Sequence, residues 1–448
     1  MAGGTPVPPQ PAFAADAEVH RALAQELRQA GDEFGALAHL IAVRALEARG
    51  GPEAAASLAA LADVATGYFM LERDAPAERW YRLLLVLAPD SAMALQNLGA
   101  LCLRNQRSAE GLAFKQQAYA LQRVFIERVP GAQRRVLLLC AGLAAGNVPF
   151  EGLLSAGLSD RIKYAIDCAK PEEDAALPPF DLVFNALGDA DATAPWQDRL
   201  ERFAHHGLQP LLNRPEAVAQ TRRDRLAGLL QGLPGLVCPA CLRLEGPEAP
   251  AAALAWVGGA GGPDWPVLLR PAGTHGGEGL QRCAGTAELL AAIQALDGAF
   301  YLSQYRDYRS TDGHFRKYRV VFVDGQPWPY HLAIGGHWLL HYFSADMLAQ
   351  DWKRDEERCF LDDPAAVLGA PAMAALRALG GRLGLDYAGV DFSLLPDGRL
   401  LVFEANATML VHRERGEGPL AHKNAAVQCI YEAFEAMLRR RLEPSPGQ

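Results

Sequence analysis

The sequence predicts a multidomain fold, in which an all-α region of helical repeats is followed by an α/β domain and then by an α+β domain. Three observations predict it. Residues 16–130 are rich in Ala, Leu, Arg and Glu, with apolar residues at helical spacing. Short apolar runs that end in turn residues, a pattern typical of buried parallel strands, lie within 134–215. Within 216–440, strands joined by glycine loops and tight turns alternate with helical segments.

Length and composition set the protein class. The 448 residues are half apolar and carry a net charge of −9, which predicts a soluble, folded protein that binds no nucleic acid. The first residues lack the basic start of a signal peptide, and no apolar run reaches the ~18 residues of a membrane span. Eight scattered cysteines indicate reduced thiols in the cytoplasm. We expect residues 1–15 to be disordered and 441–448 to form a tail.

A period of 34 residues relates small and apolar positions of the helical region. The pairs are Leu61 and Leu95, Ala65 and Gly99, Ala77 and Gly111, and Leu84 and Ala118. Small residues at helix crossings, with Pro89 at the end of one repeat, resemble the tetratricopeptide repeat (TPR). Residues 17–49 fit loosely, and because solenoids need about three units we expect a third helical pair. The resemblance implies a concave surface for a peptide or protein; packing or a homodimer contact is the alternative.

The α/β domain is expected to contain three buried strands, within "RRVLLLCAG", "RIKYAIDC" and "FDLVFNALGD". The third run ends in polar residues, among them Asn185, Asp189 and Asp191. Ligands bind beyond the carboxyl ends of strands in such sheets, so we take Asn185 as a candidate substrate contact. An ordinary turn is the alternative.

Cys238 and Cys241 have the C-x-x-C spacing of redox and zinc sites. No second C-x-x-C and no paired histidines follow them. The favoured interpretation is therefore two buried small residues.

A hairpin with Asp397-Gly398 at its turn is expected to carry a metal site. Asp391 and Glu404 each lie six steps from this turn, so antiparallel pairing brings them together. Asn406 shares the face of Glu404, because side chains alternate along a strand. Buried carboxylates without partners are costly, and three oxygen donors suit Mg²⁺. We therefore expect Asp391, Glu404 and Asn406 to be unpaired metal ligands.

The run "VLLRPAGTHGGEGLQ" predicts a strand that ends near Arg270 and enters a glycine-rich loop. Glycine lets the backbone approach phosphates and offer them N–H groups. Taken with the hairpin, this ordered series resembles the ATP-grasp superfamily of carboxylate–amine ligases, over about 134–440. The resemblance implies an α/β domain at 134–215 that precedes an ATP-grasp domain at 216–440, with a lid at about 235–302.

The resemblance also implies roles for residues at matching positions. ATP would be bound by Arg223, Arg270, Gly273, His275, Gly276, Gly277, Gly279, Ser303, Gln304, Tyr305, Arg306 and Asp307. Asp307 or Tyr308 would face the ribose, and Lys317 and Arg319 would be catalytic. Two Mg²⁺ ions would be held by the hairpin ligands. The implied reaction forms an amide bond through an acyl phosphate, with release of ADP and phosphate.

The sequence departs from this family in two places. Arg270 replaces the usual lysine, with Arg222, Arg223 or Arg225 where an earlier helix often supplies a second one. Arginine keeps the charge and adds a planar fork. Gln304 replaces a common hinge glutamate.

The substrates stay open, because fold does not fix substrate. His331, Met409 and His412 are further candidate contacts for an amino acid, another carboxylate or a peptide. Two alternatives to a ligase remain: a nucleotide-binding TPR scaffold with little activity, and an ATP-grasp kinase.

Overall fold

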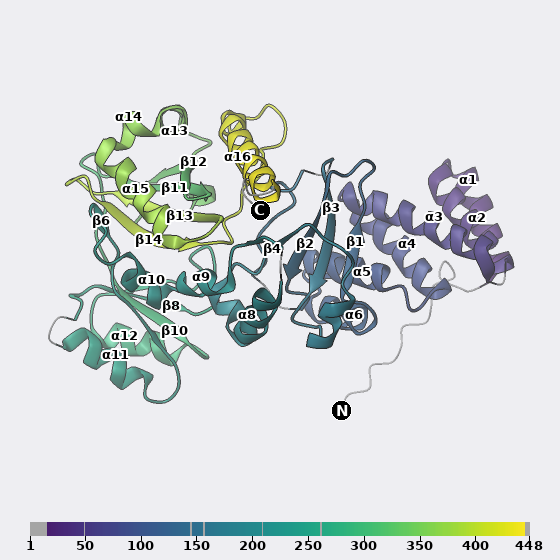
Figure 1. Cartoon of the computed structure of the whole chain (residues 1–448), viewed down its shortest axis with the longest axis horizontal. Helices are drawn as coiled ribbons and strands as arrows, with labels where there is room; N and C mark the ends of the chain where they lie inside the picture. Colours follow the sequence, from purple (N-terminus) through teal and green to yellow (C-terminus); the bar gives the residue numbers. More distant parts are fainter. Residues whose placement is uncertain are drawn as a thin grey trace. The chain divides into compact units, whose positions relative to one another are not determined.

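The computed structural model describes residues 16–443, except residues 49, 144, 145, 156, 208, 260 and 261, and the chain forms two compact units (Figure 1). The first unit contains the chain up to Phe125 together with Tyr164–Ala169, and the second contains the remainder. The predictions for 1–15 and for most of 441–448 lie outside the described residues.

The first unit is built from consecutive helices that pack in pairs. Its described helices are α1 (Ala17–Gln29), α2 (Glu33–Glu47), α3 (Gly51–Met70), α4 (Asp74–Leu87), α5 (Ala92–Arg104) and α6 (Ser108–Leu121). Two aspartates, Asp16 and Asp32, begin α1 and α2 by accepting a backbone N–H of the first turn, as N-cap residues do. The expected third helical pair is therefore present.

Close contact between α5 and α6 explains two of the small residues in the 34-residue pattern. A Cβ atom added to Gly99 would lie 3.0 Å from the carbonyl oxygen of Gly111. A Cβ atom on Gly111 would lie 2.9 Å from the carbonyl oxygen of Gly99. The two backbones touch at this crossing, so any side chain there would force the helices apart.

Replacing Gly111 with Ala is expected to lower the stability of the helical unit by about 1–3 kcal/mol, because overpacking displaces the backbone. Gly67→Ala is the matched control, since nothing lies within 4 Å of a Cβ atom at Gly67 of α3. There the loss of backbone freedom is expected to stabilise the helix by about 0.5–1 kcal/mol. Hydrogen exchange of α5 and α3 in the full chain measures both effects; equal protection in the two variants would contradict the crossing.

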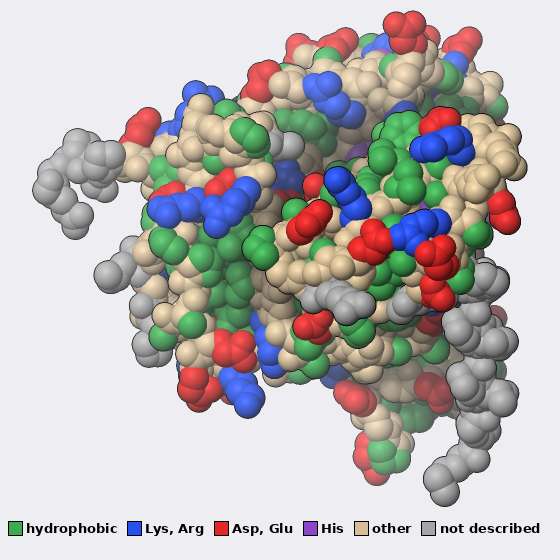
Figure 2. Space-filling model, turned by 90° about the vertical axis from the view of Figure 1, so that its right-hand side faces the viewer, with side chains coloured by type: hydrophobic (Ala, Val, Ile, Leu, Met, Phe, Trp, Pro, Cys, Tyr) green, Lys and Arg blue, Asp and Glu red, His purple; other side chains and the backbone are tan. Residues whose placement is uncertain are grey.

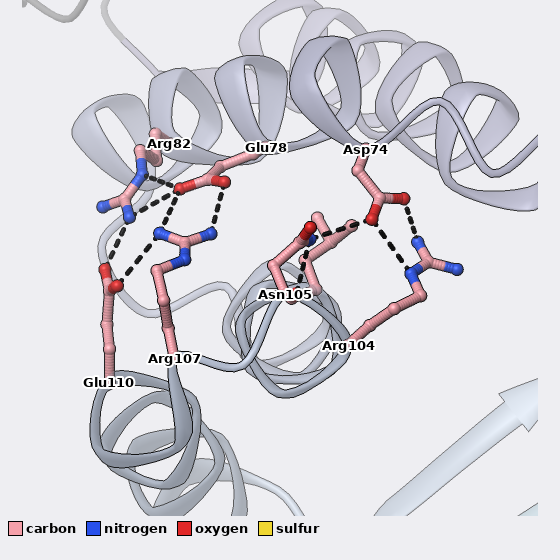
Figure 3. Close-up of polar contacts among 8 residues, drawn as sticks. Asp74, Glu78, Arg82, Arg104, Asn105, Arg107 and Glu110 are labelled. Atoms are coloured by element: carbon pink, nitrogen blue, oxygen red, sulfur yellow. Dashed lines mark hydrogen bonds and ion pairs between the residues drawn. The ribbon is translucent and has the colours of Figure 1, made fainter.

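Ion pairs link α4 to the α5–α6 pair (Figure 3). Arg107 donates to both oxygens of Glu78, at 2.9 and 2.5 Å, and to Glu110 at 3.0 Å. Arg82 donates to Glu78 and also to Glu110, the latter at 2.6 Å. Single surface ion pairs contribute little to stability, but four charges that share partners form a network that fixes the two pairs side by side.

Charged side chains of both signs lie close together on the face shown in Figure 2, with apolar side chains between them. No single charge dominates this face, which is typical of a solvated surface. Among the helices that the structure describes, none combines the length and the apolar character needed to span a bilayer.

The α/β part contains a five-stranded sheet with the order β1-β3-β2-β4-β5. Its strands are β1 (Val124–Glu127), β2 (Arg134–Cys140), β3 (Ser159–Ala165), β4 (Leu182–Asn185) and β5 (Leu211–Leu212). The pairs β2–β4 and β4–β5 are parallel; β2 and β4 lie within two of the predicted apolar runs, and β3 overlaps the other but begins two residues before it. The boundary between the two units falls within β1 and β3.

Two further sheets lie in the second unit. The four-stranded sheet has the order β7-β10-β8-β9, and the five-stranded sheet has the order β12-β11-β13-β14-β6. The strands are β6 (Leu236–Val237), β7 (Cys241–Leu244), β8 (Val267–Pro271), β9 (Gln281–Cys283), β10 (Phe300–Gln304), β11 (Phe315–Val323), β12 (Gln326–Gly335), β13 (Tyr387–Leu394) and β14 (Leu400–Asn406). All pairs are antiparallel except β14–β6.

Helices cover these sheets. Those of the second unit are η2 (Pro171–Ala176), α7 (Ala190–Thr193), η3 (Ala194–Trp196), α8 (Gln197–His206), α9 (Pro215–Gln220), α10 (Arg223–Leu230), α11 (Ala249–Gly258), α12 (Thr286–Gln294), η4 (Tyr342–Ser344), α13 (Asp351–Asp362), α14 (Pro364–Leu368), α15 (Ala370–Leu383), η5 (Ala421–Lys423) and α16 (Asn424–Leu442). Near-continuous apolar strands bury their side chains against them, and one large core holds Phe184, Phe322, Phe392 and Phe434. The sheets are therefore rigid supports for polar residues at their ends.

Candidate active site

A cavity of about 220 Å³ lies between the four-stranded and five-stranded sheets of the second unit. One part of its wall is apolar, with Leu268, Tyr305, Trp338 and Phe403. The rest is charged. Its charged residues are Arg223, Arg270, Arg306, Lys317, Arg319, Asp391 and Glu404. An apolar slot beside a cationic end is suited to a molecule that is flat at one end and anionic at the other.

Strand register brings four polar residues into one row. His331, Arg319, Asp391 and Glu404 are successive Cα partners across β12, β11, β13 and β14. Directly paired residues of antiparallel strands share a face, so the row crosses the sheet on one side. The predicted pairing of Asp391 with Glu404 is confirmed.

This pairing depends on a β-bulge. Near the turn Phe392 pairs with Val402, whereas Asp391 pairs with Glu404, so Phe403 is an extra residue on β14. Side chains of a regular strand alternate between faces, but both Phe403 and Glu404 line the cavity. The bulge therefore places an apolar side chain and a carboxylate next to each other in the same site.

Asp391 is held by two cations. Nε and Nη2 of Arg319 donate to its two oxygens at 2.6 and 2.8 Å, and Lys317 Nζ lies 3.4 Å away. Burial alone would raise the pKa of Asp391, which is 2% exposed, but the charges of Arg319 and Lys317 hold it well below its usual range. Asp391 is therefore ionised at neutral pH.

The other two candidate ligands also have partners, contrary to the expectation of unpaired oxygens. Arg223 of α10 forms an ion pair with Glu404. Burial alone would raise the pKa of Glu404, and Arg223 reverses this and lowers it. Oδ1 of Asn406 accepts hydrogen bonds from the backbone N–H and the hydroxyl of Thr408, both at 3.0 Å. Opposite charges thus balance the carboxylates in this structure.

The donor set still fits Mg²⁺, because all three side chains offer hard oxygens. Glu404 lines both the main cavity and a smaller cavity of about 40 Å³, into which Asn406 also faces. Within the described residues no three His, Cys, Asp or Glu side chains cluster as a metal site, since the third donor here is an amide. Asp391 and Glu404 offer carboxylate oxygens to the main cavity, and Glu404 and Asn406 offer oxygens to the smaller one, which Asp189 and Asp191 also line.

The glycine-rich loop between β8 and β9 faces both cavities. Gly273, Gly276, Gly277 and Gly279 have positive φ angles of 71°, 60°, 75° and 66°. Close approach adds a second requirement at Gly277, where a Cβ atom would lie 2.5 Å from Nε2 of His341. L-residues with side chains rarely adopt these angles, so this path needs glycine.

His275 ties the loop to the α/β part of the second unit. Its Nε2 lies 2.8 Å from Oδ2 of Asp189, which also caps α7 by accepting two backbone N–H groups. The hydrogen bond to Asp189 raises the pKa of His275 above its ordinary value of 6.5. The pair is therefore charged on both sides at mildly acidic pH.

Asp189→Asn is expected to lower the pKa of His275 toward 6.5, measured by NMR titration of its ring protons. A group with a raised pKa contributes stability that is complete below pH 6.5 and is lost as the pH rises through the raised value. The loop should therefore become more mobile with rising pH in the wild type, but not in Asp189→Asn. An unchanged titration in the variant would contradict the ion pair.

The predicted hinge lies along one edge of the main cavity. Ser303, Gln304, Tyr305 and Arg306 all line it. Asp307 does not, and its carboxylate instead accepts the backbone N–H of Arg309 at 3.0 Å. Of the two candidates to face a ribose, Tyr308 is the one that lines the cavity.

None of the four candidate substrate residues lines either cavity. The amide of Asn185 is buried and bonded to the carbonyl of Asn213. The ring of His331 is stacked on Tyr342. Met409 packs on Gly389, and His412 lies 3.2 Å from the hydroxyl of Tyr330.

The two C-x-x-C residues line the main cavity. Burial raises the pKa of Cys238 and that of Cys241 to about 12 each. Both thiols are therefore protonated and weakly nucleophilic at neutral pH.

Sequence reasoning missed Trp338 and Thr274 as parts of this site and offered His341 only as a weak candidate substrate contact. His341 lies in the loop after β12, directly before η4, and it contacts Gly277. Trp338 lies in the same loop and lines the apolar slot. Thr274 lies inside the glycine run and faces the smaller cavity. Only the strand and loop packing identifies them.

Comparisons with known proteins give the following results. Neither a family model nor a curated protein sequence matches the chain. Among solved structures, the chain is similar to D-alanine–D-alanine ligase from Bacillus anthracis complexed with ATP, at 15% identity and a TM-score of 0.41, covering 70% of this chain and 99% of that one.

Two other solved structures are similar to the chain. A RimK domain protein ATP-grasp from Sphaerobacter thermophilus has 18% identity and a TM-score of 0.38, covering 67% of this chain and 98% of the other. The ATP-grasp ligase PsnB, complexed with a minimal precursor, Mg and ADP, has 14% identity and a TM-score of 0.37, covering 69% and 100%.

Proposed function

We propose that the chain is an ATP-dependent carboxylate–amine ligase of the ATP-grasp type. The observation that carries this proposal is the polar end of the main cavity, where Arg270, Lys317 and Arg319 lie with two carboxylates beside a glycine-rich loop. Together with Arg223 these residues make four cations, against the two acids Asp391 and Glu404. This excess of positive charge favours a polyanion such as a triphosphate. The apolar slot lined by Phe403 is suited to a nucleobase.

In the proposed reaction, a substrate carboxylate oxygen attacks the γ-phosphorus of ATP, and the bond to the ADP oxygen breaks. The resulting acyl phosphate is attacked by an amine, which forms the amide, releases phosphate and loses a proton. Arg270, Lys317 and Arg319 would stabilise charge on the phosphates. The glycine loop would exclude water, which otherwise hydrolyses the acyl phosphate.

Asp391, Glu404 and Asn406 would hold Mg²⁺, which when bound supplies charge neutralisation at the phosphate oxygens. Arg223 and Arg319 now bind these carboxylates. In the proposed complex some N–H groups of each guanidinium would donate to phosphate. The planar guanidinium is suited to this, because it can form two parallel hydrogen bonds to a phosphate group.

The first test is ADP release from Mg·ATP, with amino acids and small peptides added in pools and product masses measured alongside. Pool-dependent ADP, with a product mass equal to both reactants less water, would support a ligase and identify its substrates. Mg·ATP binding without ADP formation in any pool would contradict the ligase and favour the second candidate below. Absence of nucleotide binding would overturn both.

The second candidate is a nucleotide-binding scaffold without ligase activity. The ion pairs Arg223–Glu404 and Arg319–Asp391 favour it, because they satisfy both carboxylates without a metal. We further propose that the helical pairs, which resemble TPR repeats, dock a peptide or protein substrate or a second copy of the chain.

A further inference from the structure

The loop that covers the site is fastened to the same arginine that faces the cavity. Arg270 lies near the end of β8 and is half-buried, and the chain turns back over it through Gly273. Nη2 of Arg270 donates to the carbonyl oxygen of Thr274 at 2.5 Å, and Nε lies 3.3 Å from the Thr274 hydroxyl. The hydroxyl in turn donates to the carbonyl of Pro271 at 2.9 Å.

These bonds use only part of the guanidinium. Arginine has five N–H donors in a rigid fork, and the two bonds to Thr274 occupy two of them. The others remain for an acceptor in the cavity that Arg270 lines. A lysine at this position would present three N–H groups on a single nitrogen, and its flexible stem would not fix both partners.

Thr274 has a suitable place for such a role. It lies four residues beyond Arg270 and faces the smaller cavity, together with Gly273, His275 and Asn406. The next residue, His275, bonds Asp189, so the loop is held on both sides of its turn. A ligand that shifts the side chain of Arg270 would therefore also shift the part of the glycine-rich loop that contains Thr274 and His275.

We propose that Thr274 is a positioning residue, which anchors the glycine-rich loop on the guanidinium of Arg270 so that one side chain holds both the anion and the loop above it. The role of the anion rests on the proposed function, whereas the anchor itself does not. The arginine that replaces the family's usual lysine thus links occupancy of the cavity to closure of the loop.

Burial lowers the pKa of Arg270 to about 10, and the neighbouring charge of Arg223 adds to the effect. Arg270 is still charged at neutral pH. A phosphate near it would offset the repulsion from Arg223, and hydrogen bonds from a charged donor are stronger than neutral ones. A bound anion is therefore expected to hold the Arg270 guanidinium in place, and with it the bonds to Thr274.

The test compares Thr274→Val with Thr274→Ser in the full chain. Valine has the shape of threonine without the hydroxyl, whereas serine keeps it. Glu278 is exposed in the same loop, so cleavage after Glu278 by a glutamate-specific protease reports how often the loop opens. In the nucleotide-free protein Thr274→Val is expected to be cleaved roughly threefold to tenfold faster than the wild type, and Thr274→Ser at the wild-type rate.

Arg270→Lys provides a second variant, which keeps the charge and removes the fork. It is expected to accelerate the same cleavage at least as much as Thr274→Val. Wild-type rates in both Thr274→Val and Arg270→Lys would overturn the anchor. During turnover, Thr274→Val should also raise the ratio of ADP to amide product with KM for ATP within about twofold, which general loss of stability would not produce.

Calorimetry of Mg·ATP with the wild type separates the two proposals. Failure of nucleotide to bind would overturn the proposed function and the link to an anion, while the cleavage rates of the free protein would still decide the anchor. Binding that protects Glu278 in the wild type but less in Thr274→Val would support both.

Discussion

Glu404→Gln is expected to reduce ADP formation by a factor of about 100 to 1000 while leaving the fold intact. Loss of one preorganised electrostatic group at a reacting centre has effects of this size. The amide is nearly isosteric with the carboxylate, but it neither neutralises Arg223 nor offers a metal a charged oxygen. Steady-state ADP release under the conditions that give product measures the effect.

A matched control is Glu172→Gln, which removes one carboxylate from an exposed position of η2. It should retain wild-type turnover. Melting temperatures of both variants should stay within a few degrees of the wild type, because Glu404 is at the cavity wall and not in the core. Full activity of Glu404→Gln would show that this carboxylate takes no part in the reaction.

Arg319→Met is expected to lower the free energy of unfolding of the second unit by about 3–5 kcal/mol, because it leaves the buried Asp391 without its bidentate partner. Lys317, at 3.4 Å from Asp391, places the expected value at the lower end of this range. Activity should be lost as well. Arg377→Met, at an exposed position of α15, is expected to change stability by less than about 0.5 kcal/mol.

The double variant Arg319→Met/Asp391→Asn shows which effect destabilises Arg319→Met: the lost attraction between the two side chains, or the uncompensated charge left on Asp391. Removing both partners is expected to recover most of the stability, because the uncompensated carboxylate is then gone. Denaturant unfolding, followed by hydrogen exchange in β11 and β13, measures each variant. If the double variant were as unstable as Arg319→Met, the cost would lie in packing of the arginine stem and not in the charge.

Much of the second unit could be predicted from local patterns. Asp324 and Gly325 in one hairpin turn, and Gly398 in the other, have positive φ, and strand periodicity on each side of the turns predicted the hairpin lengths. Counting from the turn paired Asp391 with Glu404 correctly. The count succeeded although the strand is irregular, because the bulge at Phe403 restores the symmetric pairing by the position of the acid.

The partners of the charged residues could not be predicted in this way. Arg223 and Glu404 are 181 positions apart in the chain, and His275 reaches Asp189 from a different sheet. Such contacts depend on how the sheets pack, and a sequence pattern records only near neighbours. For the same reason, the sequence could not show that His331 stacks on Tyr342 or that His412 lies against the hydroxyl of Tyr330, both outside the cavity lining.

The bulge at Phe403 also has a consequence for how this site could change over generations. Strand β14 contains one residue more than its partner needs, so a deletion of one codon at Phe403 preserves the pairs on either side. Such a deletion would remove the aromatic wall and keep the acid, whereas deletion of Glu404 would bring the aromatic residue opposite Asp391. Both deletions leave a strand of the same length, so the identity of the lost residue would decide whether a descendant of this protein binds through shape or through charge.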